Sequence, residues 1–167
     1  VYDKKEINAV INVLKNNSLS LIDGEKVKKL EKNISNIFGK KYGLMVNSGS
    51  SANLLALSSF NFKKGSEVIT PSLTFSTTVA PIYQLGLVPH FIGVEENKFL
   101  ADISQIKKCI NKKTVAIMIP NLLGNIADWK KIHIIAKKFN LKVIEDSADT
   151  IGYKVNKKNL GRYSDVV

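Results

Sequence analysis

Arginine is almost missing from this chain of 167 residues: all but one of its 25 basic residues are lysines, and Arg162 is the exception. The formal net charge of +11 would suit nucleic-acid binding. Base recognition, however, favours arginine, because its planar guanidinium group makes paired hydrogen bonds. The lysines are spread along the whole chain, many as adjacent pairs, and no basic cluster interleaved with aromatic residues occurs. We therefore interpret them as solvated helix surfaces and expect no nucleic-acid partner.

Cysteines, histidines and long apolar runs are also scarce. The single cysteine, Cys109, cannot form an internal disulfide, and it makes no zinc-binding pattern with the two histidines. There is no run of about 18 apolar residues, so no membrane-spanning helix is expected. The N-terminal segment lacks the apolar stretch and cleavage site of a signal peptide. These absences favour a cytoplasmic protein with no membrane contact and no metal site.

The residues that are present, 44% hydrophobic and 23% charged, suit a globular domain. Apolar runs alternate with amphipathic segments, which predicts an α/β fold with a mostly parallel sheet flanked by helices. The strands are predicted at Tyr42–Asn47, Val68–Pro71, Leu87–Val94, Thr114–Ile119, Leu141–Glu145 and Tyr163–Val167. The helices are predicted at Lys5–Lys15, Glu25–Phe38, Ser50–Phe60, Thr77–Gln84, Asp102–Ile110 and Asp128–Phe139. Because the chain lacks an initial methionine and ends inside an apolar run, we expect 1–167 to be one domain, truncated at its C-terminal side.

Three polar segments follow predicted strands, where ligands bind in such folds. Asn47–Asn53 (NSGSSAN) opens a helix with small hydroxyl residues, which is typical of a phosphate site and also of a plain helix cap. Phe75 lies in the polar loop after Val68–Pro71, where it could stack on a flat ligand or anchor the core. Glu145, Asp146 and Asp149 place three carboxylates within five residues, an arrangement that needs partners if it is buried.

Together these segments favour pyridoxal 5′-phosphate (PLP) as the ligand. The first would bind its phosphate, Phe75 would stack on its ring, and a carboxylate would keep its pyridine nitrogen protonated so that the ring accepts electrons. A metal ion fits the carboxylates less well, because no histidine or cysteine stands at ligand spacing. The order of the three segments along the chain is more specific than any one of them.

The same segments resemble the DegT/DnrJ/EryC1/StrS family of PLP-dependent nucleotide-sugar aminotransferases, over nearly the whole chain. The matching stretches are Val46–Leu57 (VNSGSSANLLAL), Val68–Ile82 (VITPSLTFSTTVAPI) and Val143–Gly152 (VIEDSADTIG). The resemblance implies the large domain of a fold-type I PLP-dependent transferase. It also implies a nucleotide-sugar substrate and a homodimer, with the partner subunit completing the phosphate pocket.

The resemblance also implies roles for individual residues. Ser50 and Ser51, together with Gly49 and the N–H groups of Ser51 and Ala52, would hold the phosphate. Phe75 would stack on the ring and Asp146 would pair with the ring nitrogen. Asp149 falls near the phenolic oxygen of the cofactor, where the family often has histidine or glutamine, and two anionic oxygens there would repel one another. The catalytic residue is expected beyond Val167, so the chain by itself should be inactive.

The particular residues in these motifs favour one branch of the family. Ser-Gly-Ser-Ser-Ala-Asn, the Leu123–Asn125 loop and Asp149 resemble the sugar 3-dehydrases. In that branch a histidine replaces the cofactor-linking lysine, and the cofactor works as pyridoxamine 5′-phosphate (PMP). We expect the whole enzyme to remove the C3 hydroxyl of a nucleotide-linked 4-keto-6-deoxyhexose in deoxysugar and surface polysaccharide synthesis. Transfer of an amino group to the keto sugar is the alternative, and a PLP enzyme of the same fold that acts on amino acids is a further one.

Overall fold

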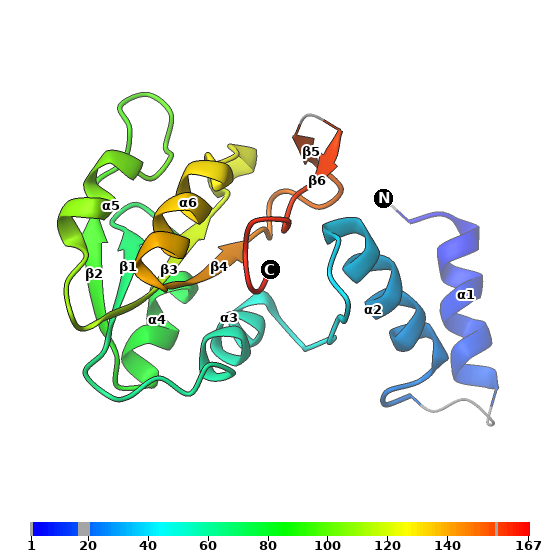
Figure 1. The fold of residues 1–167 in the computed structure, drawn as a ribbon. Coiled ribbons are helices and arrows are strands. Elements are labelled where there is room, and N and C mark those ends of the chain that lie inside the picture. Colours follow the sequence, from blue (N-terminus) through cyan, green and yellow to red (C-terminus); the bar gives the residue numbers. More distant parts are fainter. Residues whose placement is uncertain (1, 17–20, 156) are drawn as a thin grey trace. The chain divides into compact units, whose positions relative to one another are not determined.

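Figure 1 shows the computed structural model of the chain, which describes residues 2–16, 21–155 and 157–167. The chain folds into two compact units. The first comprises residues 1–36 and 40–45, and the second comprises residues 37–39 and 46–167. The described strands belong to the second unit.

The first unit contains α1 (Lys4–Lys15) and most of α2 (Glu25–Phe38). A reciprocal pair of hydrogen bonds begins α1: the Asp3 side chain accepts from the N–H of Lys5 at 2.6 Å, and the Glu6 side chain accepts from the N–H of Asp3 at 2.9 Å.

The predicted strand at 42–47 is wrong. Within the described residues this segment pairs with no strand, and Tyr42 and Leu44 are each 76% exposed. An apolar run forms a strand only where a neighbouring strand accepts its backbone hydrogen bonds. Here the N–H of Met45 donates to a side chain instead, the Glu31 carboxylate, at 2.7 Å.

The second unit is built on a four-stranded parallel sheet in the order β2-β1-β3-β4 (Figure 1). Its strands are β1 (Glu67–Pro71), β2 (Val88–Ile92), β3 (Thr114–Pro120) and β4 (Lys142–Asp146). Its helices are α3 (Gly49–Ser58), α4 (Ser76–Gln84), α5 (Ile103–Cys109) and α6 (Trp129–Phe139). The order reverses between β1 and β3, and this reversal is the position at which doubly wound folds bind ligands.

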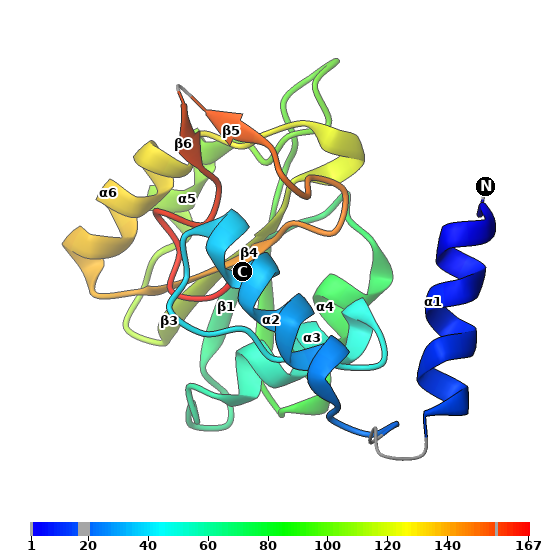
Figure 2. The same ribbon diagram turned by 90° about the vertical axis from the view of Figure 1, so that its right-hand side faces the viewer.

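Helices cover both faces of this sheet. Leu57 of α3 and Ile82 of α4 pack with Val68, Met118 and Ile144 in one buried cluster. α5 and α6 contact each other (Figure 2), and their buried side chains include Ile106 and Ile132. β3 is almost continuously buried because both of its faces are covered, which explains its unbroken apolar sequence. The predicted parallel α/β architecture is confirmed. In the part of the chain that the structure describes, no helix has the length and apolar character needed to cross a membrane.

The predicted strand at Tyr163–Val167 is also wrong, because only Val166 pairs with the sheet, through an isolated parallel bridge to Ile144. Asp165 explains the interruption. Its carboxylate accepts the N–H of Val143 at 2.8 Å, and its own N–H donates to the carbonyl oxygen of Val143 at 2.8 Å. Asp165 thus takes the N–H of Val143 and shares the carbonyl oxygen of Val143 with the N–H of Val166, which is 3.3 Å away, so regular pairing along β4 is limited to Val166. Before it, β5 (Lys154–Val155) and β6 (Lys158–Asn159) form a short antiparallel pair.

Candidate functional site

Helix α3 begins directly after a serine that caps it. The Oγ atom of Ser48 accepts the N–H of Ser51 at 3.2 Å, and the carbonyl oxygen of Ser48 accepts the N–H of Ala52 at 3.0 Å. Helix geometry leaves the N–H groups of Gly49 and Ser50 without an intrahelical acceptor. The donors available to an anion are therefore these two, earlier in the helix than the N–H groups of Ser51 and Ala52 that the resemblance implied.

Strand β4 ends at Asp146, whose half-buried carboxylate is bound by two helices. Its Oδ2 atom accepts a hydrogen bond from Nδ2 of Asn53 in α3 at 2.9 Å and one from Oγ1 of Thr78 in α4 at 2.9 Å. Nδ2 of Asn53 also donates to the carbonyl oxygen of Thr77 at 3.2 Å. On the other carboxylate oxygen, Oδ1, the N–H of Ala148 is 3.4 Å away. The side chain of Asp146 is thus held in place by parts of the chain distant in sequence.

Phe75 lies at the N-cap position of α4, in the segment that follows β1. The residue is 67% exposed, so its side chain does not anchor the core. In the part of the chain that the structure describes, the buried hydroxyls of Thr70 and Thr74 in the same stretch have no hydrogen-bond partner. Because β1 and β4 belong to one parallel sheet, their carboxyl ends lie at the same edge. That edge offers an aromatic face, a carboxylate and unused hydrogen-bonding capacity.

Asp149 is exposed and bound to the loop that follows β3. Its Oδ2 atom accepts the N–H of Leu123 at 2.9 Å. Leu123 lies in the single turn Leu122–Gly124 with φ of 55°, in the left-handed region that non-glycine residues rarely adopt. Asp149 therefore stabilises a turn that the local sequence alone would not favour.

Glu145 turns to the opposite face of β4 and is almost fully buried, at 1% exposure. Its Oε1 atom accepts from Nδ2 of Asn121 at 3.1 Å and from Oγ of Ser147 at 2.9 Å. Its Oε2 atom accepts from the N–H of Gly161 at 3.1 Å and from Oγ of Ser164 at 3.2 Å. Burial raises the pKa of Glu145, although all four donors favour the charged form. This carboxyl group joins β4 to the segment that leads to Val167.

The three carboxylates that the sequence places together are thus separated by the structure. Glu145 faces a closed polar network, Asp146 faces α3 and α4, and Asp149 faces the turn after β3. Among residues 2–16, 21–155 and 157–167, no group of three or more histidine, cysteine or acidic side chains could hold a metal ion.

Asn53 and Thr78 were missed by the sequence analysis as functional residues, although both lie inside the quoted motifs. Asn53 is only 9% exposed and Thr78 is fully buried. One signal was available. A buried position near the start of a helix that points toward the sheet is normally apolar, so a polar residue there needs a partner.

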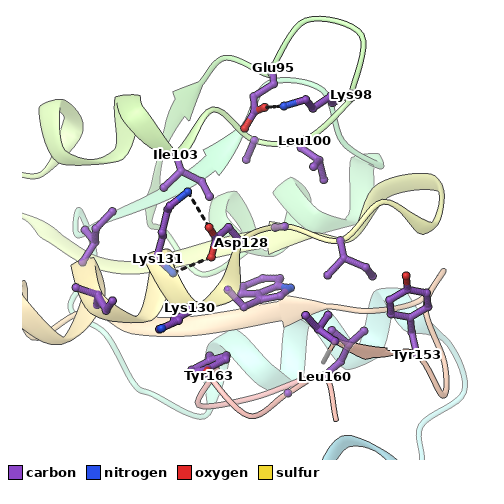
Figure 3. Close-up of a pocket in the computed structure, with 18 of the residues that line it drawn as sticks. Glu95, Lys98, Leu100, Ile103, Asp128, Lys130, Lys131, Tyr153, Leu160 and Tyr163 are labelled. Atoms are coloured by element: carbon purple, nitrogen blue, oxygen red, sulfur yellow. Dashed lines mark hydrogen bonds and ion pairs between the residues drawn. The ribbon is translucent and has the colours of Figure 1, made fainter. Parts of the chain in front are cut away.

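A large open cavity lies elsewhere in the second unit. It has a volume of about 1210 Å³ and is lined by α5, the start of α6 and the β5–β6 pair (Figure 3). Two ion pairs lie in its lining: Lys98 with Glu95 at 2.6 Å, and Lys131 with Asp128 at 2.9 Å. None of Asn53, Phe75, Thr78 or Asp146 lines it. The polar groups at the carboxyl edge of the sheet, rather than this cavity, carry the candidate chemistry.

Comparison with known proteins decides the family. A model of the DegT/DnrJ/EryC1/StrS aminotransferase family matches residues 1–167. The chain belongs to this family. A curated member, the GDP-4-keto-6-deoxy-D-mannose 3-dehydratase of Yersinia pseudotuberculosis, is 37% identical over 97% of the chain. The dTDP-3-amino-3,6-dideoxy-alpha-D-galactopyranose transaminase of Aneurinibacillus thermoaerophilus is 33% identical, also over 97% of the chain.

A solved structure from the same family agrees in fold. The Escherichia coli GDP-4-keto-6-deoxy-D-mannose-3-dehydratase with bound hydrated PLP superposes with a TM-score of 0.86 and 35% identity, over 95% of the chain. The expectation of a fold-type I large domain is thereby confirmed. The chain spans 42% of the length of that protein, 42% of the Yersinia dehydratase and 44% of the transaminase.

Proposed function

We propose that the whole protein is a PLP- or PMP-dependent enzyme that removes the C3 hydroxyl of a nucleotide-linked 4-keto-6-deoxyhexose. The observation that carries the proposal is the Asp146 carboxylate, held by Asn53 and Thr78 at the carboxyl edge of the sheet. We further propose that 1–167 is the N-terminal part of the cofactor-binding large domain and that the enzyme acts as a cytoplasmic homodimer. The family membership and the relatives named above support this assignment.

The side chains at this edge fit the cofactor. The N–H groups of Gly49 and Ser50, with the hydroxyls of Ser50 and Ser51, would bind its phosphate at the positive end of the α3 dipole. The exposed ring of Phe75 would cover one face of the pyridine ring. The hydroxyls of Thr70 and Thr74, which have no hydrogen-bond partner among the described residues, lie in the same segment and give this edge further polar capacity. Every one of these residues comes from the second unit.

Asp146 would control the proton on the ring nitrogen. The bound cofactor supplies an electron-accepting ring, which makes the carbon atoms next to the sugar ketone reactive. A carboxylate in contact with the ring nitrogen keeps that nitrogen protonated, because the charge pair favours the protonated form. Asn53 and Thr78 fix the carboxylate, so that it need not reorient when the cofactor binds.

Two observations favour removal of the hydroxyl group over amination: the sequence identities to the relatives and the particular residues of the motifs. The 3-dehydratase is 37% identical to the chain and the transaminase 33%. Ser-Gly-Ser-Ser-Ala-Asn and Asp149 were interpreted as marks of the dehydrase branch from the sequence alone. Amination of the keto sugar is the second candidate, and the similarity to the transaminase supports it.

Product analysis separates the two reactions. The purified full-length protein is incubated with a stoichiometric amount of PMP and GDP-4-keto-6-deoxymannose, and the sugar nucleotide is examined by mass spectrometry. We expect a product that has lost the C3 oxygen and gained no nitrogen. A product that carries nitrogen on the sugar would establish the transaminase instead. If neither this sugar nucleotide nor other nucleotide-linked 4-keto-6-deoxyhexoses are converted, both functions are contradicted. The identity of the catalytic residue, which is expected beyond Val167, gives an independent test, since the dehydrase branch has histidine where the transaminases have lysine.

Asp149 is expected to act by holding the Leu122–Gly124 turn rather than through its charge. Asparagine can still accept the Leu123 N–H, whereas alanine cannot. In Asp149→Ala, amide hydrogen exchange of a peptide covering 121–125 should accelerate roughly five- to tenfold, as expected for the loss of one hydrogen bond. In Asp149→Asn it should remain close to that of the unmodified protein. If the amides of this peptide exchange as fast in Asp149→Asn as in Asp149→Ala, the negative charge itself holds the turn and this interpretation is wrong.

A further inference from the structure

Two buried donors converge on a single oxygen of Asp146. Oδ2 of the carboxylate accepts from Asn53 and from Thr78, both at 2.9 Å. A carboxylate oxygen has about two lone-pair positions, so these bonds use the capacity of Oδ2. Among the residues that the structure describes, Oδ1 has only the N–H of Ala148, at 3.4 Å, which is a long contact for a hydrogen bond. The oxygen with capacity for a further strong donor is therefore Oδ1.

The two donors also connect the elements that carry the other candidate residues. Asn53 lies in α3, one turn after the N–H groups of Gly49 and Ser50. Thr78 lies in the first turn of α4, three residues after Phe75 at its N-cap. Through the carboxylate of Asp146, the phosphate turn and the aromatic ring are therefore linked to the end of β4 by two short bonds.

We propose that Asn53 and Thr78 are positioning residues that direct Oδ1 of Asp146 toward the ring nitrogen of the cofactor. The inference rests on the proposed function. Removing either donor lets the carboxylate of Asp146 rotate, so that Oδ1 and Oδ2 can each occupy the position next to the ring nitrogen. The negative charge then lies less favourably against the protonated ring nitrogen of the cofactor. The expected result is weaker cofactor binding together with a lower pH at which the ring nitrogen loses its proton.

The variants are chosen to separate positioning from packing. Thr78→Val removes the hydroxyl at nearly constant shape, and Thr78→Ser restores a hydroxyl. Asn53→Ala removes the second donor, together with its bond to the carbonyl oxygen of Thr77. Leu57→Val is the control, because Leu57 is buried in the core one turn further along α3 and is not among the partners of Asp146.

The experiment titrates PLP into the full-length protein and follows the absorbance of the bound cofactor, first at fixed pH and then as a function of pH. In Thr78→Val and in Asn53→Ala the dissociation constant should rise about tenfold, the effect of losing one hydrogen bond to a charged group. The midpoint of the pH titration should fall by about one pH unit, which corresponds to a tenfold change in the proton dissociation constant of the ring nitrogen. Thr78→Ser and Leu57→Val should keep both values of the unmodified protein.

Failure of this inference can be distinguished from failure of the proposed function. If the unmodified protein binds neither PLP nor PMP, the proposed function is wrong and the inference falls with it. If it binds the cofactor and Thr78→Val leaves both quantities unchanged, Asn53 and Thr78 only stabilise the fold. If Leu57→Val produces the same changes as Thr78→Val, the changes arise from lost stability and the positioning role is likewise rejected.

Discussion

Replacing Asp146 with asparagine is expected to abolish most of the activity of the full-length enzyme while leaving its fold intact. The amide oxygen of asparagine can accept the same hydrogen bonds from Asn53 and Thr78, so α3, α4 and β4 stay joined. A neutral amide cannot stabilise a positive charge on the ring nitrogen. We therefore expect turnover to fall roughly 100- to 1000-fold, the effect of removing one essential electrostatic contact.

Three measurements check this prediction: turnover with saturating cofactor, cofactor affinity, and the thermal unfolding midpoint without cofactor. Asp146→Ala should lose turnover completely and also lower the unfolding midpoint, because it removes the acceptor that Asn53 and Thr78 share. Glu67→Gln is the matched control, since it neutralises a carboxylate at the start of β1, at the opposite edge of the sheet, and should leave turnover unchanged. Turnover in Asp146→Asn that equals that of the unmodified enzyme would rule out a role for Asp146 in catalysis.

The sequence predicted most of the second unit because its elements are defined by local patterns. β3 is an unbroken apolar run and α5 has Asp102 at its cap, where the carboxylate accepts the N–H of Ser104 at 3.0 Å. Patterns of this kind depend on residues within one element. The two failed strands, 42–47 and Tyr163–Val167, are short apolar segments whose state depends on a partner elsewhere in the chain. In one the N–H of Met45 binds Glu31, and in the other Asp165 occupies the backbone groups of Val143.

The candidate site shows the same division. Phe75 and Asp146 lie where β1 and β4 end, so the sequence pattern itself marks the carboxyl edge of the sheet there. Gly49 to Ala52 open α3 as predicted, although the strand predicted before them does not form. The partners of Asp146 could not be predicted, since Asn53 is 93 positions away along the chain and Thr78 is 68. Sequence proximity also suggested one acidic cluster, but neighbouring residues of a strand face opposite sides of the sheet. Glu145 and Asp146 therefore serve different networks.

Glu145 gives the prediction with the largest expected effect on stability. Replacing it with leucine removes one acceptor for each of four donors, two of which are the Nδ2 group of Asn121 and the N–H of Gly161. Nδ2 of Asn121 also donates to Oγ of Ser147 at 2.9 Å, and Oγ of Ser164 also donates to the carbonyl oxygen of Gly161 at 3.0 Å, so the loss falls mainly on the N–H of Gly161 and on Oγ of Ser147. Each buried donor left without a partner costs about 1–3 kcal/mol, so we expect the free energy of unfolding of the full-length protein to fall by about 3 kcal/mol. Chemical denaturation measures it. A loss of less than about 1 kcal/mol would mean that the network rearranges without the carboxylate.

The raised pKa of Glu145 also gives this residue a defined effect on the pH dependence of stability. Because burial makes the folded protein hold the proton more firmly than the unfolded chain, the contribution is present below the ordinary glutamate pKa. It is lost as pH rises through the raised value. Unfolding midpoints measured on the acid side of neutrality should therefore decline with rising pH in the unmodified protein. The decline should be smaller in Glu145→Gln, which does not titrate.

Glu67 provides a control, because its pKa is shifted in the opposite direction from that of Glu145. Its pKa is lowered, chiefly by the hydrogen bond from the Asn111 side chain at 2.6 Å. Its contribution is present above the ordinary glutamate pKa and is lost as pH falls through the lowered value. Glu67→Gln should flatten the pH dependence on the acid side of the ordinary pKa and leave the decline at higher pH unchanged. If Glu145→Gln and Glu67→Gln alter the same part of the profile, burial does not control the protonation of Glu145.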